Sequence, residues 1–113
     1  MAISMKRSVT ALLAFALLAG ASMAACAGIL RGAQSCDNWM QYKQNEAYQL
    51  ANEVWLLGFL SGLSQGLDND FIKGTDNKTI FRWVDSYCIA YPHKNIGEAG
   101  EALAAELIKQ KSR

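Results

Sequence analysis

Apolar residues recur at helical spacing in four stretches of this chain, and no stretch alternates apolar and polar positions as a strand does. The longest stretch, residues 46–67, carries apolar side chains almost all round the helix, so we expect it to be central and buried. The stretch at residues 76–91 has one apolar stripe and ends before Pro92, which disfavours a helical residue in front of it. The pattern therefore predicts a small all-α domain of four helices.

Capping residues mark the starts of the first and the last helix. Ser35 precedes a short helix over residues 36–44 and is a candidate N-cap. Asn95 precedes the last helix, and Glu98 follows three residues later, as in a capping box. Between the second and third helices, residues 68–75 are rich in Asp, Asn and Gly, which predicts a loop.

The apolar stripes are expected to meet in a single core. Gly58, Gly62 and Gly66 recur every four residues and leave one face of the long helix without side chains. Such a face could serve helix dimerisation, as small residues do in membranes, or it could let a neighbouring helix of the same domain approach closely. We favour the second interpretation. The residues expected to be mostly buried include Trp55, Leu57, Trp83 and Leu103.

Residues 1–27 have the layout of a secretory signal peptide. Lys6 and Arg7 precede an apolar core of about a dozen residues, and the small residues of Gly20 to Ala27 follow. This core falls short of the roughly 20 apolar residues that a membrane span needs. We therefore expect residues 28–113 to form one domain that is exported to the periplasm or secreted.

The chain has three cysteines. In an oxidising compartment, Cys36 and Cys88 are expected to form a disulfide, since Cys88 lies on the buried stripe of the third helix. Cys26 has three possible fates: removal with the signal peptide, retention as a free thiol, or acylation as the first residue of a lipoprotein. Soluble export is favoured over lipidation, because Met23 stands where a lipidation motif usually has Leu.

The charged residues point to no enzyme chemistry. Loss of Lys6 and Arg7 turns 11 basic and 10 acidic residues into 9 and 10, which gives no electrostatic signature of nucleic-acid binding. The single histidine, His93, has no free cysteine to share a zinc ion and is expected to be an exposed loop residue. Asp68 and Asp70 lack the spacing of a calcium loop and form a possible partner-binding loop instead.

Two other carboxylates, Glu53 and Asp85, lie on different predicted helices and could approach each other in space. No nucleophile–base set or phosphate-binding loop accompanies them. We therefore expect a protein that is not an enzyme, holds no cofactor or metal, and binds another protein.

In three motifs the chain resembles the HdeA-like proteins, which are small exported bacterial helical domains with one disulfide joining two helices. They are SCDNWM at the first helix, WLLGFLSGL in the second, and YCIAYP before an Ala-rich amphipathic helix. The same outline is similar to the Tai-type immunity proteins, which neutralise toxins of type VI secretion, although nothing after Cys88 can supply their second cysteine pair.

The resemblance implies one of two protein partners. An HdeA-like chaperone or stress protein, possibly a homodimer, would release apolar surface toward a client at low pH as its carboxylates lose charge. An immunity protein would instead cap a toxin with a preformed surface. A third possibility is an envelope lipoprotein anchored through Cys26.

Overall fold

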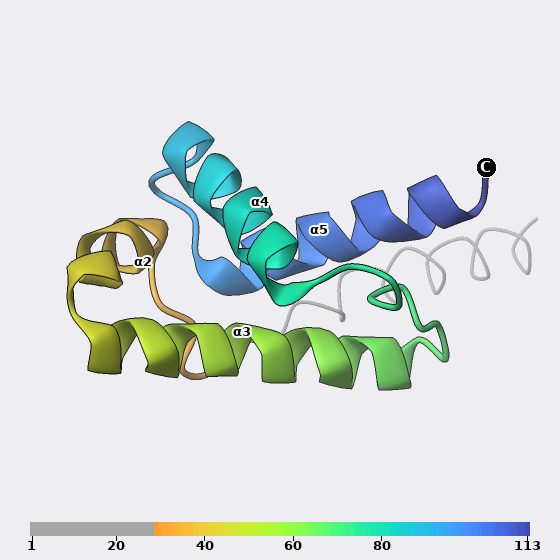
Figure 1. Ribbon diagram of the computed structural model, residues 1–113, viewed down its shortest axis with the longest axis horizontal. Coiled ribbons are helices and arrows are strands. Elements are labelled where there is room, and N and C mark those ends of the chain that lie inside the picture. The colour runs from red at the N-terminus through yellow and green to blue at the C-terminus, as the bar shows by residue number, and fades with distance from the viewer. Residues whose placement is uncertain (1–28) are drawn as a thin grey trace, which may run out of the picture.

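The computed structural model describes residues 29–113. Within this range the chain forms α-helices joined by loops, and it has no strand (Figure 1). They are α2 (Cys36–Gln41), α3 (Glu46–Gly66), α4 (Asn77–Ala90) and α5 (Ile96–Lys111), with a 3-10 turn, η1 (Tyr42–Gln44), after α2. The predicted all-α class is confirmed. None of these helices combines the length and the apolar character that a membrane crossing requires. The predicted signal peptide and Cys26 lie outside the described residues.

A side chain caps the N-terminus of each of these α-helices and accepts a hydrogen bond from the backbone N–H three residues on. The capping box is also present, because the Glu98 carboxylate accepts from the backbone N–H of Asn95 at 3.0 Å. Such caps satisfy N–H groups that have no partner within the helix. Each helix start is therefore fixed by residues close to it in the sequence. The capping residues are Ser35, Asn45, Asp76 and Asn95.

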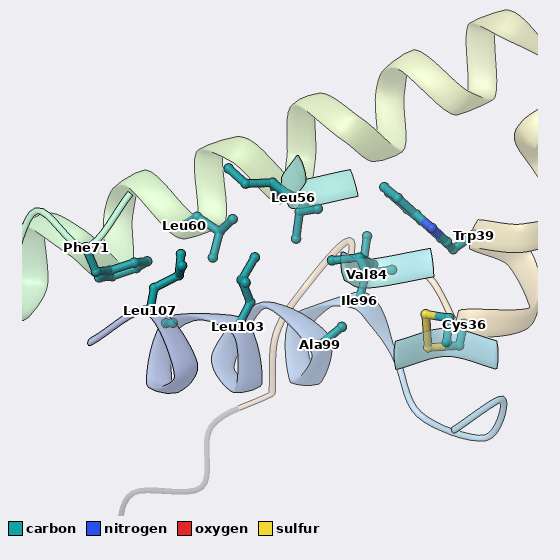
Figure 2. Close-up of a cluster of buried hydrophobic side chains, with 13 residues drawn as sticks. Cys36, Trp39, Leu56, Leu60, Phe71, Val84, Ile96, Ala99, Leu103 and Leu107 are labelled. Atoms are coloured by element: carbon teal, nitrogen blue, oxygen red, sulfur yellow. A yellow bond between two sulfur atoms is a disulfide. The ribbon is translucent and has the colours of Figure 1, made fainter. Parts of the chain in front are cut away.

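The core lies between α3 and α5 and is closed by α2 and α4 (Figure 1). Leu56 and Leu60 of α3 point toward Leu103 and Leu107 of α5, and Phe71 fills one end of the cluster (Figure 2). Trp39 and the disulfide lie at the other end. The apolar stripes therefore meet in one core, as the sequence predicted.

The predicted disulfide joins α2 to α4. The Sγ atoms of Cys36 and Cys88 are 2.17 Å apart and their Cα atoms 4.8 Å apart, and both residues are buried. Beside it, the backbone N–H of Cys36 donates to the carbonyl of Lys94 at 2.8 Å, and that of Ile96 to the carbonyl of Gln34 at 2.9 Å. These contacts hold the starts of α2 and α5 together.

Helix α3 is not buried all round, contrary to the prediction. Its buried stripe consists of Asn52, Leu56, Leu60 and Ser64. On the opposite side Leu50 and Val54 are 61% and 60% exposed. The physical reason is the size of the domain: α2, α4 and α5 all lie on one side of α3 and cannot surround a helix of 21 residues (Figure 1).

The residues that were expected in the core are not all buried to the same extent. Leu103 is buried as predicted, but Trp55, Leu57 and Trp83 are only half-buried. They pack against the core from its margin. The indole N–H of Trp55 reaches the edge of the domain, where it donates to the carbonyl of Arg31 at 3.0 Å. The N–H of a tryptophan indole usually has a hydrogen-bond partner, and a position at the margin of the core lets the Trp55 N–H reach one.

Candidate protein-binding surface

The side of α3 turned away from the other helices is here named the outer face of α3. An exposed helix face in a soluble domain normally carries charged side chains. Here the charged residues of α3 are Glu46 and Glu53, and neither lies within this face. All of its members are exposed and uncharged: Ala47, Leu50, Ala51, Val54, Gly58, Ser61, Gly62 and Gln65.

The glycines of α3 face open space. A Cβ atom added at Gly58, Gly62 or Gly66 would meet no other atom within 4 Å. The predicted close approach of a neighbouring helix at these positions is therefore wrong. Tight helix packing occurs on α5 instead, where a Cβ atom at Gly100 would lie 3.0 Å from ring carbons of Phe59.

A shallow open groove of about 320 Å³ adjoins the C-terminal end of the outer face. One wall comes from α3 and the other from the loop that follows it. Because Ser61 and Gln65 belong to both the outer face and the groove, the two form one continuous surface. The groove is lined by Ser61, Ser64, Gln65, Asp70, Ile72 and Lys73.

The structure separates the two aspartates of the predicted partner-binding loop. Both Asp68 and Asp70 are exposed in a loop, as predicted, but only Asp70 lines the groove. Asp68 has a backbone φ of 49°, in the left-handed region that a non-glycine residue rarely adopts. Asp68 therefore helps the chain to turn out of α3.

The loop is fixed by residues distant in sequence. The Lys111 ammonium donates to the carbonyl of Asp70 at 3.0 Å and to that of Lys73 at 2.7 Å. Between them, Phe71 is fully buried in the core. The groove is therefore preformed. No local pattern indicates the Lys111 contact, because it spans 41 residues to Asp70.

The hydroxyl groups near the groove bond to the backbone. Ser61 Oγ donates to the carbonyl of Leu57 at 2.7 Å, and Ser64 Oγ donates to the carbonyl of Asn69 at 2.8 Å. His93, exposed between α4 and α5 as predicted, is not part of the groove. Within residues 29–113 no group of three or more His, Cys, Asp or Glu side chains is placed to hold a metal ion.

The carboxylates of Glu53 and Asp85 have separate partners. Asp85 accepts a hydrogen bond from the indole N–H of Trp39 at 2.7 Å and forms an ion pair with Lys43 at 2.6 Å. Glu53 accepts from the side-chain amide of Gln49 at 3.0 Å. The Asp85 contacts tie α4 to α2 and η1, which gives this carboxylate a structural role.

Asn52 lies in a narrow crevice next to this cluster. Its side-chain NH₂ group is buried and has no hydrogen-bond partner among the described residues. The crevice is lined by Trp39, Lys43, Gln49 and Asn52 and has no space for a water molecule. It therefore offers no room for a ligand.

One carboxylate has a clearly shifted pKa. The backbone N–H of Thr79 donates to the Asp76 carboxylate at 2.7 Å and holds its pKa below the ordinary value of 3.8, and the Thr79 side chain lowers it further. A hydrogen bond to the charged form favours that form. Asp76 therefore stays charged, and caps α4, into acidic solution.

Comparison of the chain with protein-family models, with curated proteins and with solved structures gave no match. The surface is therefore interpreted from its own geometry. It combines an uncharged, partly apolar helix face with a preformed polar groove at one end. Exposed apolar surface of this kind is a common feature of protein interaction sites.

Proposed function

We propose that this protein is a non-catalytic protein-binding domain that acts after export, and that the outer face of α3 with the adjoining groove is its binding surface. The observation that supports this proposal is the exposure of Leu50 and Val54 on a helix face without charge. Protein interfaces are depleted of charged residues at their centre, and contiguous exposed apolar surface marks interaction sites.

The shape of the surface favours an elongated polypeptide as its partner. A helix of 21 residues is about 31 Å long, which suits an amphipathic helix or an apolar stretch of an unfolded chain. At one end, Asp70 and Lys73 offer charges of both signs that can orient such a partner. Export to the periplasm or the exterior accords with the disulfide between Cys36 and Cys88.

Within this proposal, the HdeA-like role of binding unfolded clients is the favoured one. Leu50 and Val54 are exposed in the single folded chain, and the outer face of α3 contains no carboxylate. Protonation is therefore not needed to uncover the outer face of α3, and client binding is expected at neutral pH as well as in acid. Nothing in this role requires His93, so the substitution His93→Ala should leave binding unchanged.

Capping of a toxin is the second candidate function, and the fixed loop favours it. Lys111 holds the carbonyls of Asp70 and Lys73 in place before any partner binds. A rigid preformed site of this kind loses little entropy on association with a folded partner. A lipid anchor at Cys26 would present the same surface from a membrane.

The test compares two lysine substitutions in an assay of client aggregation followed by light scattering. We expect the unmodified protein to suppress aggregation of a heat-unfolded client protein at neutral pH, and Val54→Lys to abolish most of that suppression. Ile89→Lys is the matched control, because Ile89 is 70% exposed but lies on α4. Equal suppression by Val54→Lys and Ile89→Lys would contradict the proposed surface. A protein that suppresses no aggregation at any ratio would leave toxin capping as its function.

A further inference from the structure

The serine hydroxyls of the groove beside α3 are hydrogen-bond acceptors. A hydroxyl group has one hydrogen to donate, and that of Ser61 goes to the carbonyl of Leu57 at 2.7 Å. The hydrogen of the Ser64 hydroxyl goes to the carbonyl of Asn69 at 2.8 Å. Each oxygen keeps its lone pairs, so it can form a further hydrogen bond only as an acceptor. Because both serines line the groove, its occupant must supply the donors.

A carboxylate adds to these acceptors. Asp70 is exposed and lines the same groove. Within residues 29–113 no ion pair involves Asp70, so its carboxylate can bind a cation from outside. The groove also adjoins the last turn of α3, which is the negative end of the helix dipole. The carboxylate and the helix end both favour a positively charged occupant.

We propose that the groove receives an arginine side chain of the bound polypeptide, and that Asp70 selects for it. This inference rests on the proposed function, because it names the part of the partner that the groove binds. A guanidinium group has five N–H donors in one plane and no acceptor, which complements two hydroxyl acceptors and a carboxylate. Ile72, half-buried in the wall of the groove, offers an apolar contact for the arginine stem.

Two lysines near the groove limit its affinity for a cation. Lys111 is already engaged, since its ammonium donates to the carbonyls of Asp70 and Lys73, and it does not line the groove. Lys73 does line it, but its ammonium is carried on a flexible, exposed stem that can turn toward solvent. Removing the charge of Lys73 should therefore strengthen the binding of arginine and weaken that of a carboxylate.

The groove also sets the place of the arginine in the partner. Val54 and Ser61 are separated by about 10 Å along the axis of α3. In an extended partner this distance corresponds to about three residues, and in a helical partner to about seven. The preferred partner segment therefore carries an arginine at this separation from the apolar residue that contacts Val54.

Titration with small probes tests the preference for a guanidinium group. The probes are the N-acetyl amides of arginine, citrulline and glutamate, and binding is followed at neutral pH by the NMR amide shifts of the isotope-labelled protein. Citrulline has the shape of arginine without its charge. We expect the arginine probe to shift the signals of Ser61, Ser64 and Gln65 and to bind more tightly than the other two. Failure of the arginine probe to bind, or equal or tighter binding of either other probe, would overturn the inference.

Neutralising single charges assigns the preference to the groove. Asp70→Asn should raise the dissociation constant of the arginine probe about two- to fivefold, as expected for loss of an exposed ion pair, whereas Lys73→Gln should lower it. Asp68→Asn is the matched control, because Asp68 is exposed in the same loop but does not line the groove. An unchanged constant for Asp70→Asn, or an equal rise for Asp68→Asn, would overturn the inference.

A second pair of variants tests the hydroxyl acceptors. Ser61→Ala removes one acceptor from an exposed position of α3 and should weaken binding of the arginine probe. Ser86→Ala is its control, since the Ser86 hydroxyl also donates within its own helix, to the carbonyl of Arg82 at 3.1 Å, but lies on α4. Equal affinity of the two variants for the probe would overturn the assignment of the serine oxygens as acceptors for the guanidinium group.

The titrations and the aggregation assay can fail separately. If the arginine probe does not bind while Val54→Lys still abolishes suppression of client aggregation, the inference about arginine fails and the protein-binding function stands. If the probe binds through Asp70 while Val54→Lys has no effect on suppression, the arginine site stands and the proposed function of the outer face fails.

Discussion

Replacing the glycines of the outer face of α3 with alanine should stabilise the protein. A glycine within a helix costs about 0.5–1 kcal/mol relative to alanine, because it loses more backbone freedom on folding. At Gly58 and Gly62 the added methyl group meets no atom within 4 Å, so no clash offsets this gain. The double variant Gly58→Ala/Gly62→Ala is expected to raise the free energy of unfolding by about 1–2 kcal/mol.

The gain is large enough to measure by urea or thermal unfolding followed by circular dichroism. In a domain of this size, 1 kcal/mol corresponds to a rise of about 4–8 °C in Tm. The measurement is made at low micromolar concentration, where weak association contributes little to stability. Gly100→Ala is the matched control, since its Cβ atom would lie 3.0 Å from Phe59 ring carbons and 3.4 Å from Leu56, and it should destabilise the fold.

Two outcomes would refute this reasoning. A lower free energy of unfolding for Gly58→Ala or Gly62→Ala would mean that a neighbouring helix packs on this face, as the sequence pattern first suggested. Unchanged stability of Gly100→Ala would mean that α3 and α5 are less closely packed than the distance to Phe59 indicates.

Replacing both Cys36 and Cys88 with alanine removes a link between residues 52 positions apart and should lower the free energy of unfolding by about 4 kcal/mol in the chain-entropy model. A non-reduced peptide digest should contain the two cysteines in one linked species, and free thiols at both positions would contradict the assignment. For Asp76, the hydrogen bond from Thr79 lowers the folded-state pKa below the ordinary value of 3.8. The stabilising effect of this bond is therefore present above the ordinary pKa and is lost as pH falls through the folded value. The substitution Asp76→Asn keeps a capping acceptor that does not titrate. The urea midpoint of this variant should therefore fall less than that of the unmodified protein between neutral pH and about pH 2. Equal decreases of the two midpoints would show that the cap does not respond to acid.

The helix boundaries were predictable because caps act locally. Ser35 and Asn95 each bond to a backbone N–H three residues away, so the signal and the structure lie within one turn. The disulfide was predictable for a different reason. Cys36 is the first residue of a helix, and Cys88 lies on the buried stripe of another. The chain also has so few cysteines that few disulfide pairings are possible.

The binding surface was not predictable from the pattern alone. Helix α3 is apolar on most of its circumference, so periodicity cannot tell which side meets the core. That choice follows from the other helices, which all lie on one side (Figure 1). The groove depends on Lys111, far along the chain from the loop that it holds. Asp70 was identified correctly as part of an exposed loop, but its neighbours in the groove could be found only from the fold.

The contribution of α5 to the core has a consequence for synthesis. Ile96, Ala99, Leu103, Ala104 and Leu107 are all buried, and α5 follows the other helices that the structure describes. A polypeptide that emerges from the ribosome or from a translocation pore N-terminus first cannot close its core until this helix has arrived. Folding is therefore postponed until α5 has been delivered, and until then the preceding segments stay in a state that a narrow pore can pass. Products that break off before α5 lack this part of the core and are expected to remain open to proteases.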